Sequence, residues 1–200
     1  MKIAIVGASG AVGQEFLRVL EERNFPMDEL VLFGSKRSAG TQYLFRGQPL
    51  TVKLLQHNDD FKDIDIAFVS AGGGTSKEFA ETITKYGAVM IDNSSAFRMD
   101  EEVPLVVPEV NPEDVEWHKG IIANPNCSTI ITLMAVAGIA KLSPIETMIA
   151  CTYQAVSGAG QAGFSELEGQ MAAAVKGGEI QCKVFPTQIA LNVIPHIGDE

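Results

Sequence analysis

The sequence predicts an α/β protein that opens with a doubly wound parallel sheet. Three observations lead to this fold class. Short, almost wholly apolar runs recur along the first 130 residues, glycine-rich turns follow several of them, and amphipathic segments lie between them. Strands that are buried on both faces of a parallel sheet have such continuous apolar runs, and helical crossovers connect them. We therefore predict a first domain over residues 1–130 and a second over residues 131–200.

The first predicted strand runs into a glycine-rich turn and then into a helix. The apolar run KIAIV is followed by GASGAVG and by QEFLRVLEERN, whose apolar residues recur at helical spacing. Gly7 permits the tight turn, Gly10 lets the backbone approach a pyrophosphate, and Gly13 lets the helix pack close to the sheet. The first N–H groups of the helix favour a bound phosphate. We predict a Rossmann-type dinucleotide site, although the G-x-x-G-x-x-G spacing also fits a turn that only packs a helix on a sheet.

The second predicted strand indicates which dinucleotide binds. A site that prefers NAD usually has an Asp or Glu near the end of this strand, where it binds the ribose 2′-hydroxyl. The strand ELVLFGS is instead followed by KRSAG, so that Ser35, Arg37 and Ser38 occupy this place. A guanidinium with flanking hydroxyl groups suits a 2′-phosphate. We predict NADP as the cofactor, and the alternative is an exposed basic turn.

Further strands and one more helix complete the predicted sheet. Two short strands with a glycine turn are expected in QYLFRGQPLTVKLL, and a strand, loop and helix in DIDIAFVSAGGGTSKEFAETITKYG. Ligands of open α/β sheets bind at the carboxyl ends of strands, which makes Gly72 in the second segment a candidate cofactor-binding residue. Three later apolar runs are expected to be strands: AVMIDNSS, LVVPEVN and GIIANPN.

The pattern changes from about residue 130. CSTIITLMAVAGIAKL indicates a strongly apolar helix, IETMIACTYQAVSGAG a β-rich run with Cys151 in the core, and GFSELEGQMAAAVKGG a second helix. One apolar stripe is expected on that second helix, formed by Phe164, Leu167, Met171 and Val175. Residues 131–200 are few for a domain of this kind, so we expect it to be truncated.

Composition and charge disfavour several classes of function. The chain has 200 residues and a formal net charge of −10, which disfavours nucleic acid as a partner. No apolar run approaches the roughly 18 residues of a membrane span, and the first apolar segment is too short for a signal peptide. Three cysteines without motif spacing predict neither a disulfide framework nor a metal site. We expect a soluble, cytoplasmic protein with reduced thiols.

Cys127 is the candidate nucleophile. Pro125 precedes it, and the apolar period of the next helix begins just after it, so the thiol is expected in the first helical turn. Unpaired N–H groups in a first turn stabilise a thiolate and can later hold an oxyanion. The alternative is an inert, small core residue. A dinucleotide-binding fold with a cysteine nucleophile indicates aldehyde oxidation through a thioester.

Six motifs within residues 7–160 together resemble the aspartate-β-semialdehyde dehydrogenase family: GASGAVG, SKRSAG, DNSSAFR, VPLVVPEVN, NPNCST and TYQAVSGAG. The resemblance implies a Rossmann domain followed by an α+β catalytic and dimerisation domain. It implies the reductive dephosphorylation of L-aspartyl-4-phosphate by NADPH to L-aspartate 4-semialdehyde and phosphate, on the path to lysine, methionine and threonine. It also implies a homodimer or a dimer of dimers.

The resemblance further implies roles for individual residues. Cys127 matches the acyl-thioester nucleophile, Asn126 a residue that orients the substrate or oxyanion, and Gln154 one that positions the substrate near the thiol. Arg98 matches a phosphate-binding arginine, and its planar fork suits phosphate. The alternatives are a strand cap for Gln154 and a surface charge for Arg98. The matches to cofactor-binding segments are Ser9, Gly10, Ala11, Val12, Arg37, Ser38, Ser157 and Gly158, the last two on the nicotinamide side.

Part of the family pattern has no match. The general acid/base histidine and the arginine that holds the substrate carboxylate belong to downstream segments, and His196 does not match the catalytic motif. We therefore expect the 200-residue chain alone to be nearly inactive, and His196 to be structural or exposed. Two related families fit less well, because N-acetyl-γ-glutamyl-phosphate reductase has a motif closer to HPGCYPT and glyceraldehyde-3-phosphate dehydrogenase has SCTTN. A non-catalytic dinucleotide-binding module is the alternative from a different class.

Overall fold

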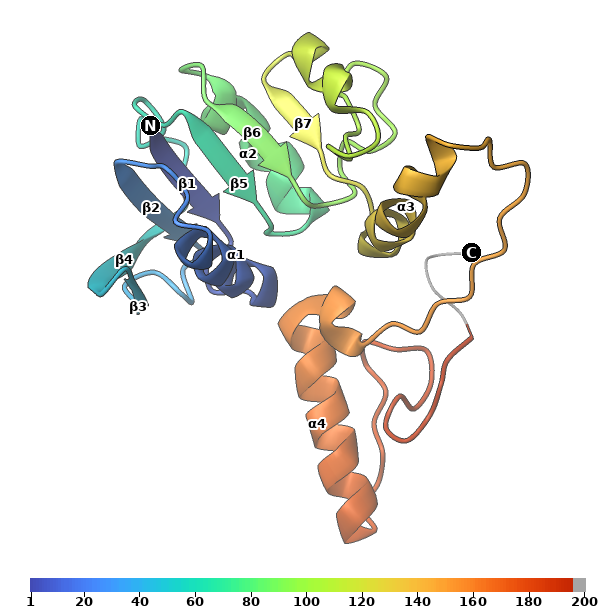
Figure 1. Ribbon diagram of the computed structural model, residues 1–200. Coiled ribbons are helices and arrows are strands. Elements are labelled where there is room, and N and C mark those ends of the chain that lie inside the picture. Colours follow the sequence, from blue (N-terminus) through green and yellow to red (C-terminus); the bar gives the residue numbers. More distant parts are fainter. Residues whose placement is uncertain (196–200) are drawn as a thin grey trace. The chain divides into compact units, whose positions relative to one another are not determined.

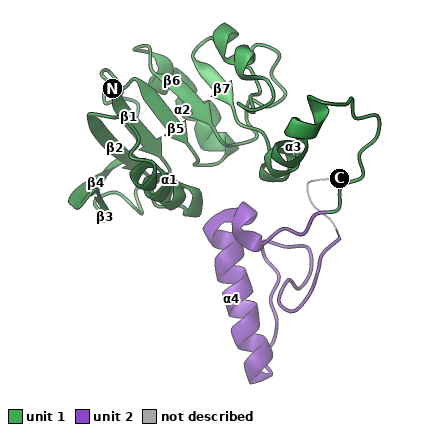
Figure 2. Ribbon diagram, in the orientation of Figure 1, with its two compact units in different colours: residues 1–151 green, residues 152–200 purple. Residues whose placement is uncertain are grey.

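The structure is a computed structural model that describes residues 1–195 (Figure 1). It divides into two compact units, Met1–Cys151 and Thr152–Glu200 (Figure 2). The functional border near residue 130 stays a prediction, because the division by compactness does not test it. His196 lies outside the described residues.

Unit 1 is built on a seven-stranded sheet in the order β3-β4-β2-β1-β5-β6-β7. All neighbouring strands pair in parallel except β3 and β4, which form an antiparallel hairpin. The chain builds outward from β1 to β2 and β4, then returns to β5 on the other side of β1. This reversal of strand order defines a doubly wound sheet, so the predicted fold class is confirmed. The strands are β1 (Lys2–Val6), β2 (Glu29–Gly34), β3 (Gln42–Phe45), β4 (Gln48–Leu54), β5 (Ile66–Val69), β6 (Val89–Asp92) and β7 (Ile121–Ala123).

Helices cover both faces of this sheet (Figure 1). Successive side chains of β1 enter two different cores, because neighbouring residues of a strand point to opposite faces. Ile5 packs in the cluster that contains Leu17 of α1, whereas Val6 packs in the cluster that contains Ile83 of α2. Burial on both faces explains why the strand is apolar at nearly every position. The helices of unit 1 are α1 (Ala11–Glu22), α2 (Gly73–Thr84), the 3₁₀ helix η1 (Pro112–Trp117) and α3 (Cys127–Ala140).

The strand predicted for LVVPEVN is wrong. Leu105 forms an isolated bridge with Ala123 of β7, and the segment then turns away from the sheet. The cause is local: Pro108 has no N–H to donate to a ladder. The side chain of Asn111 accepts the N–H of Val107 at 2.9 Å and donates to the carbonyl of Leu105 at 3.0 Å, which curls the backbone before η1.

The β-rich run predicted around residues 145–155 is also absent. Residues 144–155 form no helix or strand, and Cys151 is exposed rather than in a core. A strand needs a partner for its backbone N–H and C=O groups. None of the described strands pairs with this segment, and its apolar side chains stay at the surface, with Ile149 91% exposed.

Unit 2 consists of the 3₁₀ helix η2 (Val156–Ala159), the helix α4 (Gly160–Lys176) and the segment that follows them. The helix ends at the predicted glycine pair, because Gly177 adopts a left-handed conformation with φ of 65°. The predicted apolar stripe is not a buried face: Val175 is 84% exposed, and the buried positions of the described helix are Gly163 and Gln170.

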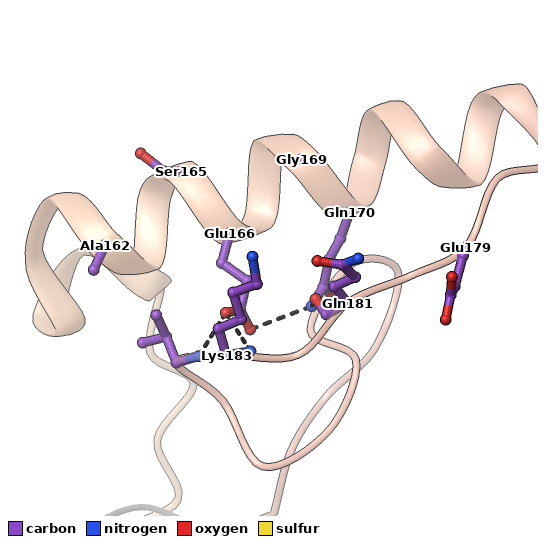
Figure 3. A pocket seen from close by; sticks show the side chains of 9 residues that line it. Ala162, Ser165, Glu166, Gly169, Gln170, Glu179, Gln181 and Lys183 are labelled. Carbon is purple, nitrogen blue, oxygen red and sulfur yellow. Dashed lines mark hydrogen bonds between the residues drawn. The ribbon is translucent and has the colours of Figure 1, made fainter.

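Polar side chains instead hold the segment after α4 to the helix, where they line a pocket (Figure 3). Gln170 is 2% exposed, and its Oε1 accepts the N–H groups of Ile189 and Ala190 at 2.9 and 3.1 Å. Glu166 accepts N–H groups from Lys183, Val184 and Phe185. Partial desolvation raises the pKa of Glu166, but these donors outweigh it and hold the pKa below its ordinary value.

Candidate active site

The candidate site lies at the carboxyl edge of the sheet in unit 1. Parallel strands end at the same edge, which brings together the segments that follow β1, β2, β5, β6 and β7. These segments contain the glycine turn, the Ser35–Ser38 turn, the glycines at the start of α2, the Arg98 loop and Cys127. The sequence-predicted residues of the first 130 positions therefore belong to one edge of one sheet.

The glycine turn packs as tightly as predicted. A Cβ atom on Gly13 would lie 2.3 Å from the carbonyl oxygen of Gly7, which leaves no room for a side chain between helix and turn. Gly10 is the N-cap of α1 and makes no side-chain cap, while Ala11 and Val12 in the first turn are exposed. The first N–H groups of α1 are therefore available to a ligand.

Ser9 supports a ligand at this turn. Its hydroxyl oxygen is buried and has no hydrogen-bond partner among the described residues. A buried hydroxyl without a partner costs free energy, about 1–3 kcal/mol, and native structures rarely keep one. A phosphate group of a dinucleotide beside the first turn of α1 would supply the missing partner. The residues present thus fit a bound dinucleotide.

The turn after β2 is shaped by hydrogen bonds to Ser35. The N–H groups of Ser38 and Ala39 donate to the carbonyl of Ser35 at 3.0 and 2.9 Å, and the Ser38 hydroxyl donates to it at 3.2 Å. Gly34 makes this possible, because a Cβ at that position would lie 2.3 Å from the Ser38 hydroxyl oxygen. Arg37 is exposed at the tip of the turn and takes part in no ion pair among the described residues.

The glycines after β5 lie beside the loop after β6. Gly72 has φ of 87° and is the N-cap of α2, and its carbonyl accepts the N–H of Ser76 at 3.0 Å. A Cβ on Gly73 would lie 3.8 Å from the hydroxyl oxygen of Ser95. Gly73, which directly follows the predicted cofactor-binding residue Gly72, therefore lies beside the predicted phosphate-binding loop.

Arg98 ties two loops of the site together. Its Nε donates to the carbonyl of Asn124 at 2.9 Å, and its Nη2 donates to the carbonyl of Asn93 at 3.0 Å. The side chains of Asn124 and Asn93 are themselves hydrogen-bonded at 2.7 Å. These contacts exclude a loose surface charge paired with nearby acids, and they orient the guanidinium beside the segment that leads to Cys127.

Cys127 lies where the sequence predicts it, in the first turn of α3. Asn126 is the N-cap, and its side-chain oxygen accepts the N–H of Ser128 at 2.9 Å. The thiol is exposed, and its sulfur lies 3.9 Å from the same Asn126 oxygen. The alternative of a core position for this cysteine is therefore wrong, and its role as the nucleophile stays a prediction. Since its Oδ1 is engaged in this way, the Asn126 amide has its Nδ2 hydrogens for a substrate oxygen.

Three predicted site residues belong to unit 2. Gln154 lies in the irregular segment before η2, and Ser157 and Gly158 lie within η2. All three are exposed. Their roles toward the substrate and the nicotinamide stay predictions.

Sequence reasoning missed three residues that shape the site: Gly34, Ser76 and Asp92. Asp92 directly follows the apolar part of the predicted strand AVMID, a position where a carboxylate either faces a ligand or anchors a loop. That position was the available signal.

Among the described residues, no cluster of three or more His, Cys, Asp or Glu side chains is arranged to hold a metal ion. No described helix is both long enough and apolar enough to span a membrane.

Comparison with known proteins agrees with this geometry. Residues 2–118 match the family described as semialdehyde dehydrogenase, NAD binding domain, and residues 136–200 match the semialdehyde dehydrogenase dimerisation domain. The aspartate-semialdehyde dehydrogenase of Aquifex aeolicus is 56% identical over 199 residues, which is 98% of this chain and 58% of that protein. The Bacillus subtilis enzyme of the same name is 50% identical, over 98% of this chain and 59% of its own length.

A solved structure gives the same result. Aspartate semialdehyde dehydrogenase II of Vibrio cholerae, complexed with ASA, superimposes with a TM-score of 0.93 at 46% identity, over 99% of this chain and 59% of that one. The chain thus spans somewhat under three fifths of the length of the relatives that it matches. The resemblance carried by the six motifs is confirmed. The first domain match alone covers more than half of the sequence, and the chain belongs to the semialdehyde dehydrogenase family.

Proposed function

We propose that the natural protein is an aspartate-semialdehyde dehydrogenase. It would reduce L-aspartyl-4-phosphate to L-aspartate 4-semialdehyde and phosphate with NADPH, in the biosynthesis of lysine, methionine and threonine. The observation that carries the proposal is the placement of Cys127 in the first turn of α3, directly after the loop that Arg98 holds. The names of the relatives over 98% of the chain support the same reaction.

The residues of the site divide the chemistry between them. The thiolate of Cys127 attacks the acyl carbon of the acyl phosphate, the C–O bond to phosphate breaks, and a thioester forms. The Asn126 amide and the first N–H groups of α3 face the oxyanion of this step. The Arg98 guanidinium holds the leaving phosphate. A bound NADPH would supply the hydride for the thioester carbon, and the Cys127 thiolate would then leave as the C–S bond breaks and the semialdehyde is released.

The cofactor would occupy the carboxyl edge of the sheet. The first N–H groups of α1 and the Ser9 hydroxyl suit the pyrophosphate, and Gly72 borders the same region. Ser35, Arg37 and Ser38 suit the 2′-phosphate of NADP. Ser157 and Gly158 are assigned to the nicotinamide side from the family motif alone.

Replacing Arg37 with alanine is expected to reduce the preference for NADPH over NADH by about 10- to 100-fold, because one charge-assisted contact to the 2′-phosphate is lost. NADH has no phosphate at that position, so its affinity should change little. The measurement is the dissociation constant of each cofactor by fluorescence titration. Lys36→Ala removes the same charge from the neighbouring exposed residue and should change the ratio less than about threefold. An unchanged preference for NADPH over NADH in Arg37→Ala would contradict the assignment of Arg37 to the 2′-phosphate.

A homodimer or a dimer of dimers in the cytoplasm is the assembly that we propose. The match of residues 136–200 to a dimerisation domain supports it. The exposed apolar side chains of α3 and the segment after it support it as well, among them Ile131 at 71%, Leu142 at 89% and Ile149 at 91% exposure. Large apolar side chains left exposed along one stretch of the chain are typical of a segment that is covered in the working protein.

The test is NADP reduction by the natural gene product with aspartate semialdehyde, with and without phosphate. We expect activity that requires phosphate, because phosphate must attack the thioester in this direction. The 200-residue chain by itself is expected to be inactive, since the family's acid/base histidine and carboxylate-binding arginine match none of its motifs. A preference for the N-acetylated glutamate semialdehyde would replace the proposed substrate, and cofactor binding without any turnover would favour a binding module.

A further inference from the structure

Asp92 stands out among the buried residues. Of the side chains that the structure describes, it is the one charged group with no exposed surface, and it lies at the carboxyl end of β6, in the edge that forms the candidate site. Burying a carboxylate is costly unless hydrogen bonds compensate for the lost water. No Lys or Arg forms an ion pair with it within residues 1–195. Its hydrogen bonds therefore show what the charge is used for.

The carboxylate accepts hydrogen bonds from two serines. Oδ1 accepts the hydroxyl of Ser76 at 2.6 Å and the backbone N–H of Ser94 at 3.2 Å, and Oδ2 accepts the hydroxyl of Ser94 at 2.6 Å. The Ser94 hydroxyl oxygen in turn accepts the N–H of Ala96 at 3.1 Å. One carboxylate thus organises two consecutive turns of the loop that leads to Arg98.

This loop bears directly on the guanidinium. Arg98 reaches back to the carbonyl of Asn93, which lies between Asp92 and Ser94, and forward to the carbonyl of Asn124. If the loop unwound from Asp92, the donor group of Arg98 would lose its fixed place relative to the segment before Cys127. The second contact, to Ser76, anchors the first turn of α2 and does not reach Arg98.

We propose that Asp92 is a positioning residue for phosphate binding. It acts through Ser94 and the loop, and it fixes the Arg98 guanidinium at the distance and angle at which a phosphate is held beside the thiol. The proposal rests on the proposed function for its substrate. It adds a residue to the site for which the sequence motifs imply no role.

The test uses Asp92→Asn in the natural gene product. The amide keeps the shape and can still accept the Ser76 hydroxyl, but its Nδ2 cannot accept the Ser94 hydroxyl. We expect the KM for phosphate to rise about tenfold or more, since a hydrogen bond to a charged group is lost. The KM values for NADP and aspartate semialdehyde should change less than about threefold. A merely structural role would instead lower the melting temperature and kcat without a selective rise in one KM.

Two serine variants separate the two arms of the network. Ser94→Ala is expected to reproduce the selective rise in phosphate KM, and combining it with Asp92→Asn should add little, because both break the same contact. Ser76→Ala should lower the melting temperature and leave the KM for phosphate unchanged. Asp100→Asn is the matched control, because Asp100 is an exposed carboxylate two residues after Arg98 that accepts the N–H of Glu102.

Calorimetric phosphate binding provides a readout that does not depend on turnover. A wild-type protein that binds phosphate but does not oxidise aspartate semialdehyde would overturn the proposed function, while weaker phosphate binding by Asp92→Asn would still support the positioning role. If Asp92→Asn kept the KM and the affinity for phosphate of the wild-type protein, the positioning role would be overturned. An equal rise in the KM for phosphate in Ser76→Ala and Ser94→Ala would overturn it as well, since the carboxylate would then act as a general anchor of both segments.

Discussion

Replacement of Cys127 by serine is expected to lower phosphate-dependent NADP reduction by about 10⁴-fold or more. The proposed reaction passes through a thioester, and a serine hydroxyl is both a weaker nucleophile and a poorer leaving group than a thiolate. Serine has nearly the same size, and residue 127 is exposed in the first turn of α3, so the fold should be retained. The measurement is the steady-state rate of the natural gene product with saturating aspartate semialdehyde and phosphate.

The other cysteines provide the controls for this variant. Cys151 is also exposed, but it lies in an irregular segment and begins no helix. Cys151→Ser should keep the rate within about twofold. Cofactor binding should be retained in Cys127→Ser, because the glycine turn follows β1, whereas Cys127 follows β7. Substantial phosphate-dependent activity in Cys127→Ser would reject the thioester route and return Cys127 to a non-catalytic role.

The first part of the fold could be predicted from the sequence because its signals are local. An apolar strand, a glycine turn and an amphipathic helix each show their pattern within a dozen residues, as in the unit around Gly7 and Gly13. The two wrong strands fail for different physical reasons. The segment of Leu105 begins to pair with β7, but Pro108 and the hydrogen bonds of Asn111 end the pairing. The segment of Ile149 is apolar and β-branched, but a strand also needs a paired backbone, and the apolar pattern does not reveal the partner.

The residues of the candidate site likewise fall into those with a local sequence signal and those explained only by tertiary contacts. Cys127 was predictable because a proline followed by a long apolar period locates the start of a helix. Arg98 was identified by its motif, but its contacts to Asn93 and Asn124 join loops that are far apart in the sequence. Asp92 and Ser76 were missed because a buried polar residue is explained only by its partners, and those partners are set by tertiary packing.

Replacement of Gly7 by alanine is expected to destabilise unit 1 by about 3–5 kcal/mol, more than any ordinary surface substitution. Two costs add at this position. Gly7 has φ of 89°, which L side chains rarely adopt, and a Cβ there would lie 2.2 Å from the carbonyl oxygen of Ser70. That oxygen belongs to backbone directly after β5, so it cannot swing aside without shifting the edge on which the cofactor turn is built. The free energy of unfolding in urea measures the loss.

Gly40→Ala is the control that separates the cost of backbone strain from the cost of the steric contact. Gly40 has nearly the same φ, 86°, but a Cβ there would meet nothing within 4 Å. We expect it to lose about 1–2 kcal/mol from backbone strain alone, so the difference between the variants measures the steric contact with Ser70. Equal losses would show that the turn relaxes away from β5. The close packing of turn, strand and helix would then not be what holds the dinucleotide edge in place.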